Sequence, residues 1–412
     1  MSLPPLHFQA AEFGRVAVET LAWLVAGAWC WRTSDTVRYI PTLPDLTELE
    51  WDSSPRDGAT LTVVVPARDE AAKIAATLDA LLLADYTALK ILLVDDRSTD
   101  ATGTIMDAYV RQQAIGKQPT LEVIHMKTLP AGWLGKTHAM SVATQQSHSE
   151  YVLFTDADVL FSPSVLRRAV AYAEQSRADH LVVLPTMQVM TRGEGIVLGF
   201  FQVLGIWASR LWRVSDVASS RDFVGVGAFN LVRRAAFESI GGWAPQRMAV
   251  LEDVTLGRRM KLAGMRQRVA YAPGLVLVHW ASGAIGLVRV MTKNLFSSCN
   301  FRPLLMLGAC GWIVVFCLAP LAGLAWWPTL LPGLLVLCCI GAIYRVMGAV
   351  SRIDARYAWL YPLGAAAFVW AMLRSMMVVL WRGGVVWRGT FYALHELRRY
   401  NNPLQWGRSG RG

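Results

Sequence analysis

Charged residues are scarce in this sequence, and their scarcity is concentrated in one region. Only 17% of the 412 residues are charged, against roughly 25% in ordinary soluble proteins. Residues 304–380 contain five charges in 77 positions, whereas residues 50–300 have an ordinary soluble composition. This pattern excludes a disordered, collagen-like or coiled-coil chain and argues against a wholly soluble protein.

Cysteines are also few, and none of the six lies between residues 31 and 298. Without a CxxC or Cys/His spacing, neither a disulfide framework nor structural zinc is expected. Acidic residues are outnumbered, which gives a net charge of +10. The arginines are scattered and gather beside the apolar stretches, so anionic lipid headgroups are the expected partner and nucleic acid is not.

The first part of the chain is expected to be a membrane anchor followed by a linker. Residues 1–32 include Phe13–Trp31, an apolar stretch without the basic start or cleavage site of a signal peptide. An amphipathic helix lying on the membrane surface is the alternative. Residues 33–58 contain three prolines among polar residues and predict a linker.

Residues 59–300 are expected to form an α/β domain. Short apolar runs that predict buried strands cover 61–66, 91–96, 121–126, 151–158 and 180–185. Helical spacing separates the first of them at 69–83 and 100–115. Continuous apolar strands alternating with helices indicate a parallel, Rossmann-like sheet covered on both faces.

The region 301–381 is expected to cross the membrane two to three times. Its candidates are Leu304–Trp327, Thr329–Val350 and Ala358–Leu380, each reaching the roughly 20 residues that a bilayer requires. An earlier apolar segment, Gly199–Trp212, fits either a protein core or the membrane interface.

Carboxylates follow three of the predicted strands. Glu70 lies just after the first strand, Asp95 and Asp96 end the second, and Asp156 and Asp158 end the fourth. Functional groups gather at the carboxyl ends of parallel strands, so these acids are expected at one sheet edge. The pair Asp156 and Asp158 provides hard oxygen ligands of the kind that Mg²⁺ or Mn²⁺ prefers. A solvated turn is the plain alternative for either motif alone.

Two further motifs precede predicted helices. Lys136 follows Gly135 at a helix start, where it is available for phosphate or is simply solvated. Glu252 and Asp253 open a later helix. Acids in a first turn match the helix dipole, but a carboxylate there can also act as a general base.

Together these motifs resemble family 2 of the inverting GT-A glycosyltransferases. The matching stretches are VVVPARDE, LLVDDRSTD, GKTHAM, FTDAD, VGVGAFNLVRR and LEDVTLGRRMKLAG, in that order, within about residues 60–295. The apolar segments on both sides are similar to the membrane-bound branch, which includes ceramide glucosyltransferase-like, hopanoid-associated and carotenoid glycosyltransferases.

The resemblance implies a role for each matching residue. It implies Asp253 as the catalytic base with Glu252 beside it, Asp158 with Asp156 as metal ligands, and Mg²⁺ or Mn²⁺ as cofactor. The residues implied to bind the nucleotide-sugar donor are Pro66, Ala67, Glu70, Asp95, Asp96, Lys136, Asp156 and Arg289. It also implies that Gly225–Asn230 shapes the cleft for sugar and acceptor. The acceptor is expected to be a membrane lipid, because this cleft would open beside the apolar helices.

The sequence departs from the family at one motif. Many relatives carry Q/R-x-x-R-W just before the membrane helices, and the best match here keeps only Arg289. His279 and Lys293 are nearby candidates to replace it. Two other functions remain open: a processive polysaccharide synthase, which the lost motif disfavours, and a catalytically silent membrane scaffold of the same fold. A phosphatase is disfavoured because the DxD-x-T spacing is absent.

The basic tail, residues 382–412, gives a prediction of topology. It carries six arginines against one glutamate, which favours the cytoplasm. Nucleotide sugars also require a cytoplasmic catalytic domain in the cell membrane. Three spans after that domain would put the tail outside, so one segment is expected not to cross. Thr329–Val350, with Pro332 and Arg345, is the weakest candidate.

Overall fold

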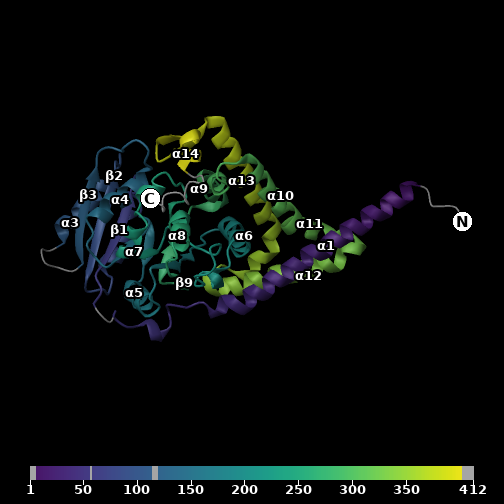
Figure 1. Cartoon of the computed structure of the whole chain (residues 1–412), viewed down its shortest axis with the longest axis horizontal. Helices are drawn as coiled ribbons and strands as arrows, with labels where there is room; N and C mark the ends of the chain where they lie inside the picture. Colours follow the sequence, from purple (N-terminus) through teal and green to yellow (C-terminus); the bar gives the residue numbers. More distant parts are fainter. Residues whose placement is uncertain (1–5, 56–57, 114–118, 401–412) are drawn as a thin grey trace.

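The computed structural model describes residues 6–55, 58–113 and 119–400, with side chains from residue 12 onward. An α/β domain occupies one side of the molecule, and a group of long helices projects from it (Figure 1). The large sheet has seven strands, in the spatial order β3 (Thr120–Met126), β2 (Leu89–Asp96), β1 (Leu61–Ala67), β4 (Tyr151–Phe154), β8 (Asn230–Arg233), β6 (His180–Leu184) and β9 (Gln267–Tyr271).

The α/β prediction is confirmed, but the sheet is mixed rather than parallel. Strand β8 runs antiparallel between β4 and β6 and is not expected from the sequence. Its four residues follow a glycine-containing loop and lead at once into helix α7 (Arg234–Ser239). Because β8 is antiparallel, its first residue, Asn230, lies opposite Phe154 at the end of β4. This geometry brings the loop before β8 to the edge where the functional acids gather.

Both faces of the sheet are buried. Every residue of β1 is buried, with Val63 and Val65 in the core on one face and Val64 in the core on the other, as the alternation of strand side chains requires. The helices of the domain are α2 (Ile74–Leu82), α3 (Thr102–Gln112), α4 (Gly135–Gln145), α5 (Val165–Gln175), α6 (Arg192–Ala208), α7, α8 (Glu252–Leu262) and α9 (Gly283–Ser298). A smaller sheet contains β5 (Val159–Phe161), β10 (Val276–Val278) and β7 (Thr186–Met187).

The helices outside the domain are α1 (Leu6–Tyr39), α10 (Pro303–Trp312), α11 (Ala319–Ala322), α12 (Trp327–Ser351) and α13 (Tyr361–Arg382). Helix α1 continues past residue 32, where the linker is expected to begin, and ends at Tyr39 before Pro41. No helix breaker occurs earlier, and a proline disfavours helical geometry in the residue before it. The linker prediction therefore applies only to the residues after α1.

Four helical segments of the described chain are long and apolar enough to cross a membrane: Arg192–Arg213, Pro303–Ala325, Trp327–Ser351 and Ala355–Arg382. Helix α1 is not among them, although it packs along α12 and projects with it from the domain (Figure 1). Several large apolar side chains of α1 are exposed, including Phe13, Trp23, Leu24 and Trp31. Exposed apolar surfaces of this kind mark sites of contact with a membrane or with another protein.

The segment after α13 is an ordered structure packed on the domain. Strands β11 (Gly384–Trp387) and β12 (Thr390–Ala393) form a hairpin, and α14 (Leu394–Tyr400) follows it. Arg247 of the domain donates a hydrogen bond of 2.6 Å to the Tyr400 hydroxyl, and Arg398 donates one of 2.8 Å to the carbonyl of Phe301. The described part of the expected tail, up to residue 400, is therefore part of the folded protein.

Candidate active site

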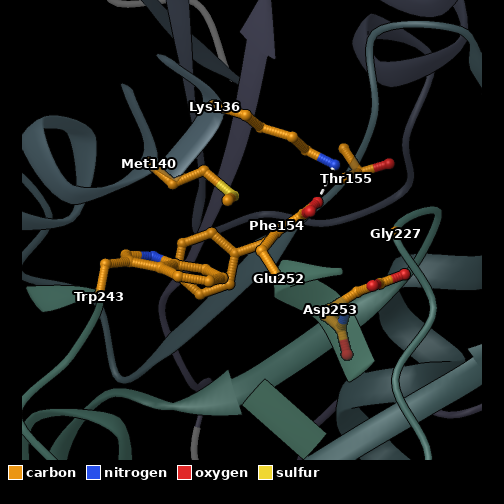
Figure 2. A pocket seen from close by; sticks show the side chains of 9 residues that line it. Lys136, Met140, Phe154, Thr155, Gly227, Trp243, Glu252 and Asp253 are labelled. Atoms are coloured by element: carbon orange, nitrogen blue, oxygen red, sulfur yellow. Dashed lines mark ion pairs between the residues drawn. The ribbon is translucent and has the colours of Figure 1, made fainter. Parts of the chain in front are cut away.

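Lys136 lies at the centre of a charged group at the sheet edge. It occupies the second position of α4, and its ammonium contacts the carboxylate of Asp156 at 2.5 Å and that of Glu252. Figure 2 shows the side chain extending to Glu252, with Asp253 next to it. Burial disfavours the charged lysine, but Asp156, Glu252 and Asp253 together raise its pKa. Three residues expected at one site from separate motifs are thus brought together.

Asp253 differs from its neighbour Glu252 in its surroundings. Glu252 is buried and paired with Lys136. Asp253 is half-buried, and the hydrogen bond recorded for its carboxylate within the described chain comes from the backbone N–H of Val254. Burial, reinforced by the charge of Glu252, raises the pKa of Asp253 to about 7. A carboxylate with a pKa near neutrality can both accept and release a proton, as a general base requires.

Asp156 and Asp158 both lie after β4, but each faces a lysine. Burial alone would raise the pKa of Asp156, yet Lys136 more than offsets it and lowers that pKa. Asp158 pairs with Lys73 at 2.8 Å. Among the described residues, no group of three or more His, Cys, Asp or Glu side chains could hold a metal. Two carboxylates still fit a divalent cation that completes its ligands with phosphate oxygens, as Mg²⁺ commonly does.

The aspartates of β2 make different contacts. Asp95 lies 3.0 Å from His125, which also contacts Asp107, and these two acids raise the pKa of His125. Asp96 is buried and accepts a hydrogen bond of 2.8 Å from Arg97. A Cβ at Gly135 would lie 2.2 Å from the Asp96 carboxylate, so only glycine fits there. Asp96 therefore faces the turn that carries Lys136, whereas Asp95 faces β3.

The end of β1 forms another wall of the site. Pro66 and Ala67 are buried in the strand, and Ala67 pairs with Asp95 across the sheet. Glu70, in the loop that follows, contacts Arg388 from the distant hairpin. The expected donor-binding residues of this loop are thus close to the second strand end, and a cation from the chain's last described region joins them.

The loop before β8 is fixed against the acids by its glycines. A Cβ at Gly225 would lie 1.9 Å from the carbonyl oxygen of Asp253, and one at Gly227 would lie 2.6 Å from the Asp156 carboxylate. Behind the loop, His180 contacts Asn230 and Gln267, and Gln267 bonds to both backbone polar groups of Val224. Burial lowers the pKa of His180 to about 4, which keeps it neutral. The hydrogen bonds of His180 and Gln267 hold the loop in place. They are not predicted from the sequence.

A small pocket of about 200 Å³, partly open to solvent, marks the inner end of the site. Its lining residues are Lys136, Met140, Phe154, Thr155, Gly227, Asn230, Trp243, Glu252 and Asp253 (Figure 2).

The candidates for the missing motif are separated by the structure. Arg289 is exposed on α9. His279 lies 3.5 Å from Glu194, whose carboxylate caps α6 and accepts a hydrogen bond from Gly283, so its contacts are structural. Lys293, one turn after Arg289, is half-buried and lies 4.1 Å from the centre of the Trp387 ring.

The hairpin that supplies Trp387 and Arg388 is absent from the sequence prediction. Its signal is present, however: an Arg-Gly pair lies between two short β-branched and aromatic runs, the pattern of a two-residue turn. Both turn residues, Arg388 and Gly389, have positive φ angles, as tight hairpins require.

Comparison with known proteins identifies related sequences. Residues 62–241 match the sequence model of glycosyl transferase family 2. Beta-monoglucosyldiacylglycerol synthase of Synechocystis sp. is 28% identical over 253 residues, which cover 59% of this chain and 48% of that protein. Poly(ribitol-phosphate) beta-N-acetylglucosaminyltransferase TarS of Staphylococcus aureus is 30% identical over 124 residues, 30% of this chain and 20% of TarS. The chain thus spans half or less of these relatives.

A solved structure shares the fold. The mannosyltransferase PcManGT from Pyrobaculum calidifontis, determined in complex with GDP-Man and Mn²⁺, superposes with a TM-score of 0.51. The superposition covers 88% of this chain and 99% of PcManGT at 17% identity. At that identity the similarity establishes the architecture and nothing finer.

Proposed function

Because this chain is a family 2 glycosyltransferase, we propose that it is a membrane-integrated, inverting enzyme acting on a lipid. Its donor is a nucleoside-diphosphate sugar, with a UDP-hexose as the expected case, and its acceptor is a lipid hydroxyl. The observation that carries the proposal is the half-buried Asp253, which has no ion pair among the described residues and lies beside Lys136 and Asp156 at the sheet edge. The lipid acceptor is supported by the apolar helices that adjoin the site and by the name of the Synechocystis relative.

The proposed reaction is a single displacement. The acceptor hydroxyl loses its proton to the Asp253 carboxylate while its oxygen forms a bond to the anomeric carbon. The bond from that carbon to the diphosphate oxygen breaks, and its electron pair leaves with the nucleoside diphosphate. Lys136 offers positive charge where negative charge develops, an electrostatic contribution that is usually large. A divalent cation held by Asp156 and Asp158 would neutralise the diphosphate.

The proposed membrane arrangement follows from the path of the chain. Helices α10 and α11 lead away from the catalytic domain, and α12 returns to it, where Arg352 donates a hydrogen bond to the carbonyl of Pro273. Helix α13 then packs along α6 and α9. We assign α1, the α10–α11 segment and α12 as membrane-crossing, with the catalytic domain in the cytoplasm. The anchor expected at residues 1–32 is retained in this proposal.

The test is to incubate purified protein in lipid with a panel of radiolabelled nucleotide sugars, with Mn²⁺, Mg²⁺ or excess chelator. We expect a labelled lipid from one donor, and its loss in chelator. The Asp158→Ala variant should also fail to form it while retaining its fold. A labelled polymer would instead identify a polysaccharide synthase, and neither transfer nor donor hydrolysis would indicate a silent scaffold. Full transfer in excess chelator would refute the proposed requirement for a divalent cation.

A further inference from the structure

The hairpin of β11 and β12 contacts two separate loops of the proposed donor site. At its tip, Arg388 donates hydrogen bonds to the backbone carbonyl of Arg68 and to the carboxylate of Glu70. Arg68 in turn donates one of 3.0 Å to the hydroxyl of Thr390. At its base, the hydroxyl of Tyr392 accepts a hydrogen bond of 3.3 Å from the backbone N–H of Gly135. The hairpin therefore connects the loop after β1 with the turn that presents Lys136.

The tip of the hairpin is held in an unusual backbone geometry. Arg388 has a φ angle of 48°, in the left-handed region that residues other than glycine rarely adopt. Asp69, in the loop that receives the tip, has a φ angle of 55°. Such conformations cost free energy and persist where surrounding contacts determine them, commonly at ligand sites. For Arg388 the turn itself requires this angle, so the docking of the tip rests on its hydrogen bonds to Arg68 and Glu70.

Lys293 lies beneath this hairpin and lacks an ion pair within the described chain. Its ammonium lies against the face of the Trp387 ring. Burial lowers the pKa of Lys293 to about 8, although Glu252 and Asp156 partly oppose this effect. The charges of Lys293 and Arg388 also act on Asp156. Three cations, Lys136, Lys293 and Arg388, thus reach the surroundings of Asp156 from three different elements.

Of these three cations, Lys293 is the one for which the described residues provide no ion pair. Lys136 has two carboxylate partners and Arg388 has one, but the ring face that contacts Lys293 is uncharged. A buried cation without a charged partner costs free energy that a bound anion recovers. The donor's diphosphate is the anion that the proposed reaction brings to Asp156. Lys293 lies on α9, the helix that directly precedes α10.

We propose that the β11–β12 hairpin is a built-in wall of the donor site and that Lys293, held against Trp387, binds the diphosphate of the donor. Lys293 takes the place of the missing motif's arginine. Trp387 and Arg388 are positioning residues: the ring orients the Lys293 side chain, and Arg388 fixes the tip on the loop after β1. This inference rests on the proposed function, since it names the residues of this chain that recognise its donor.

The test compares the affinity of purified full-length protein for UDP, UMP and uridine, and for GDP, GMP and guanosine, by calorimetry. Lys293→Met should weaken binding of the preferred diphosphate about 10- to 100-fold, as expected for a lost charge-assisted hydrogen bond. Its affinity for the nucleoside should change less than about twofold, because the methionine removes charge and keeps length. Arg382→Ala, which removes an exposed arginine just before the hairpin, is the control and should bind like wild type.

The positioning residues have a separate readout. Trp387→Leu should raise the KM for the donor with little change in kcat, and Trp387→Phe should restore it by returning an aromatic face. Arg388→Ala should weaken the nucleoside and the diphosphate alike, since it loosens the loop after β1. Thermal unfolding of each variant shows that it is folded.

Three outcomes overturn the inference. Unchanged diphosphate affinity in folded Lys293→Met would exclude Lys293 while leaving the proposed function intact. Loss of diphosphate affinity in Arg289→Ala but not in Lys293→Met would assign the role to Arg289. A wild-type protein that binds neither UDP nor GDP and transfers no sugar would overturn the proposed function together with this inference.

Discussion

At the scale of single residues, the site contrasts two adjacent acids. The carboxylate of Glu252 forms an ion pair with Lys136, whereas Asp253 has no such partner among the described residues. The ion pair holds the Glu252 carboxylate on the ammonium of Lys136. The difference assigns the base to Asp253 and leaves Glu252 to hold Lys136 in place.

We expect Asp253→Asn to lower kcat by about 10²- to 10⁴-fold, the usual contribution of general-base catalysis. The amide keeps the shape of the side chain but cannot accept the proton, so binding of the donor nucleotide should persist. Initial-rate kinetics and calorimetry measure the two effects. Asp85→Asn, which alters an exposed acid paired with Arg167 outside the site, is the matched control. Normal transfer by Asp253→Asn would leave Asp253 as a helix-capping residue.

The raised pKa of Asp253 predicts a pH dependence. Activity of the free enzyme, measured as kcat/KM, should fall as the pH drops through about 7, because the base becomes protonated. The folded pKa exceeds that of the unfolded chain, so ionised Asp253 destabilises the fold above pH 7 and not below pH 4. Asp253→Asn should therefore raise the unfolding temperature at pH 8 and leave it nearly unchanged at pH 4. An activity plateau extending down to pH 5 would contradict this.

At the scale of elements, the loop before β8 determines how closely the acids approach. It lies against Asp253 and Asp156 through backbone atoms alone, since Gly225 and Gly227 leave no room for a Cβ. The buried His180 and Gln267 hold the loop from behind. The position of this loop thus follows from the mixed sheet, in which β8 is antiparallel to both β4 and β6.

We expect Gly227→Ala to reduce kcat/KM at least tenfold with little loss of stability. The new methyl group would meet the Asp156 carboxylate at 2.6 Å and displace it from Lys136, and small displacements of reacting groups are costly. Gly205→Ala in α6, where a Cβ meets nothing within 4 Å, is the control and should leave activity unchanged. Equal activity in both variants would show that the loop tolerates movement.

The sequence predicts those elements whose burial is continuous. Strands β1, β2, β3 and β6 begin and end within two residues of their predicted bounds. The apolar runs of β1, β2 and β6 suit strands that are buried on both faces of the sheet, whereas β3 is a partly exposed edge strand. Strand β8 is not predicted because its four residues are too few to show the apolar pattern of a strand. The contact between Lys293 and Trp387 also cannot be predicted from the local sequence, because it depends on how α13 packs against α9.

At the scale of the whole molecule, the contacts of α13 bear on the topology. Near the start of α13, a Cβ at Gly364 would meet the backbone of α6, and near its end Ser375 bonds to Phe296 and Thr292 of α9. One face of α13 is thus fixed to the catalytic domain. On its other side, large apolar residues are exposed at near-helical spacing: Trp359, Leu363, Trp370, Met377 and Trp381. Such a helix suits the membrane surface, where tryptophan is enriched.

These contacts change which segment is expected not to cross the membrane. The sequence marks Thr329–Val350 as the weakest candidate, but this stretch forms the continuous helix α12, packed along α1. Helix α13 is the better choice, because the domain holds it along its length. Two crossings after the catalytic domain would return the chain to the cytoplasm, which agrees with the arginines of the segment after residue 381.

Single cysteines tested with a membrane-impermeant thiol reagent would decide the topology. In a background with the six native cysteines replaced by alanine and activity retained, we expect Trp327→Cys, at the far turn before α12, to react in intact cells. Arg399→Cys, in α14 beside the catalytic domain, should react only after the cells are opened, because an even number of crossings keeps it inside. Asp107→Cys in the catalytic domain is the internal reference. Reaction of Arg399→Cys in intact cells, with Asp107→Cys protected, would mean that α13 crosses the membrane and that the hairpin cannot reach the donor site.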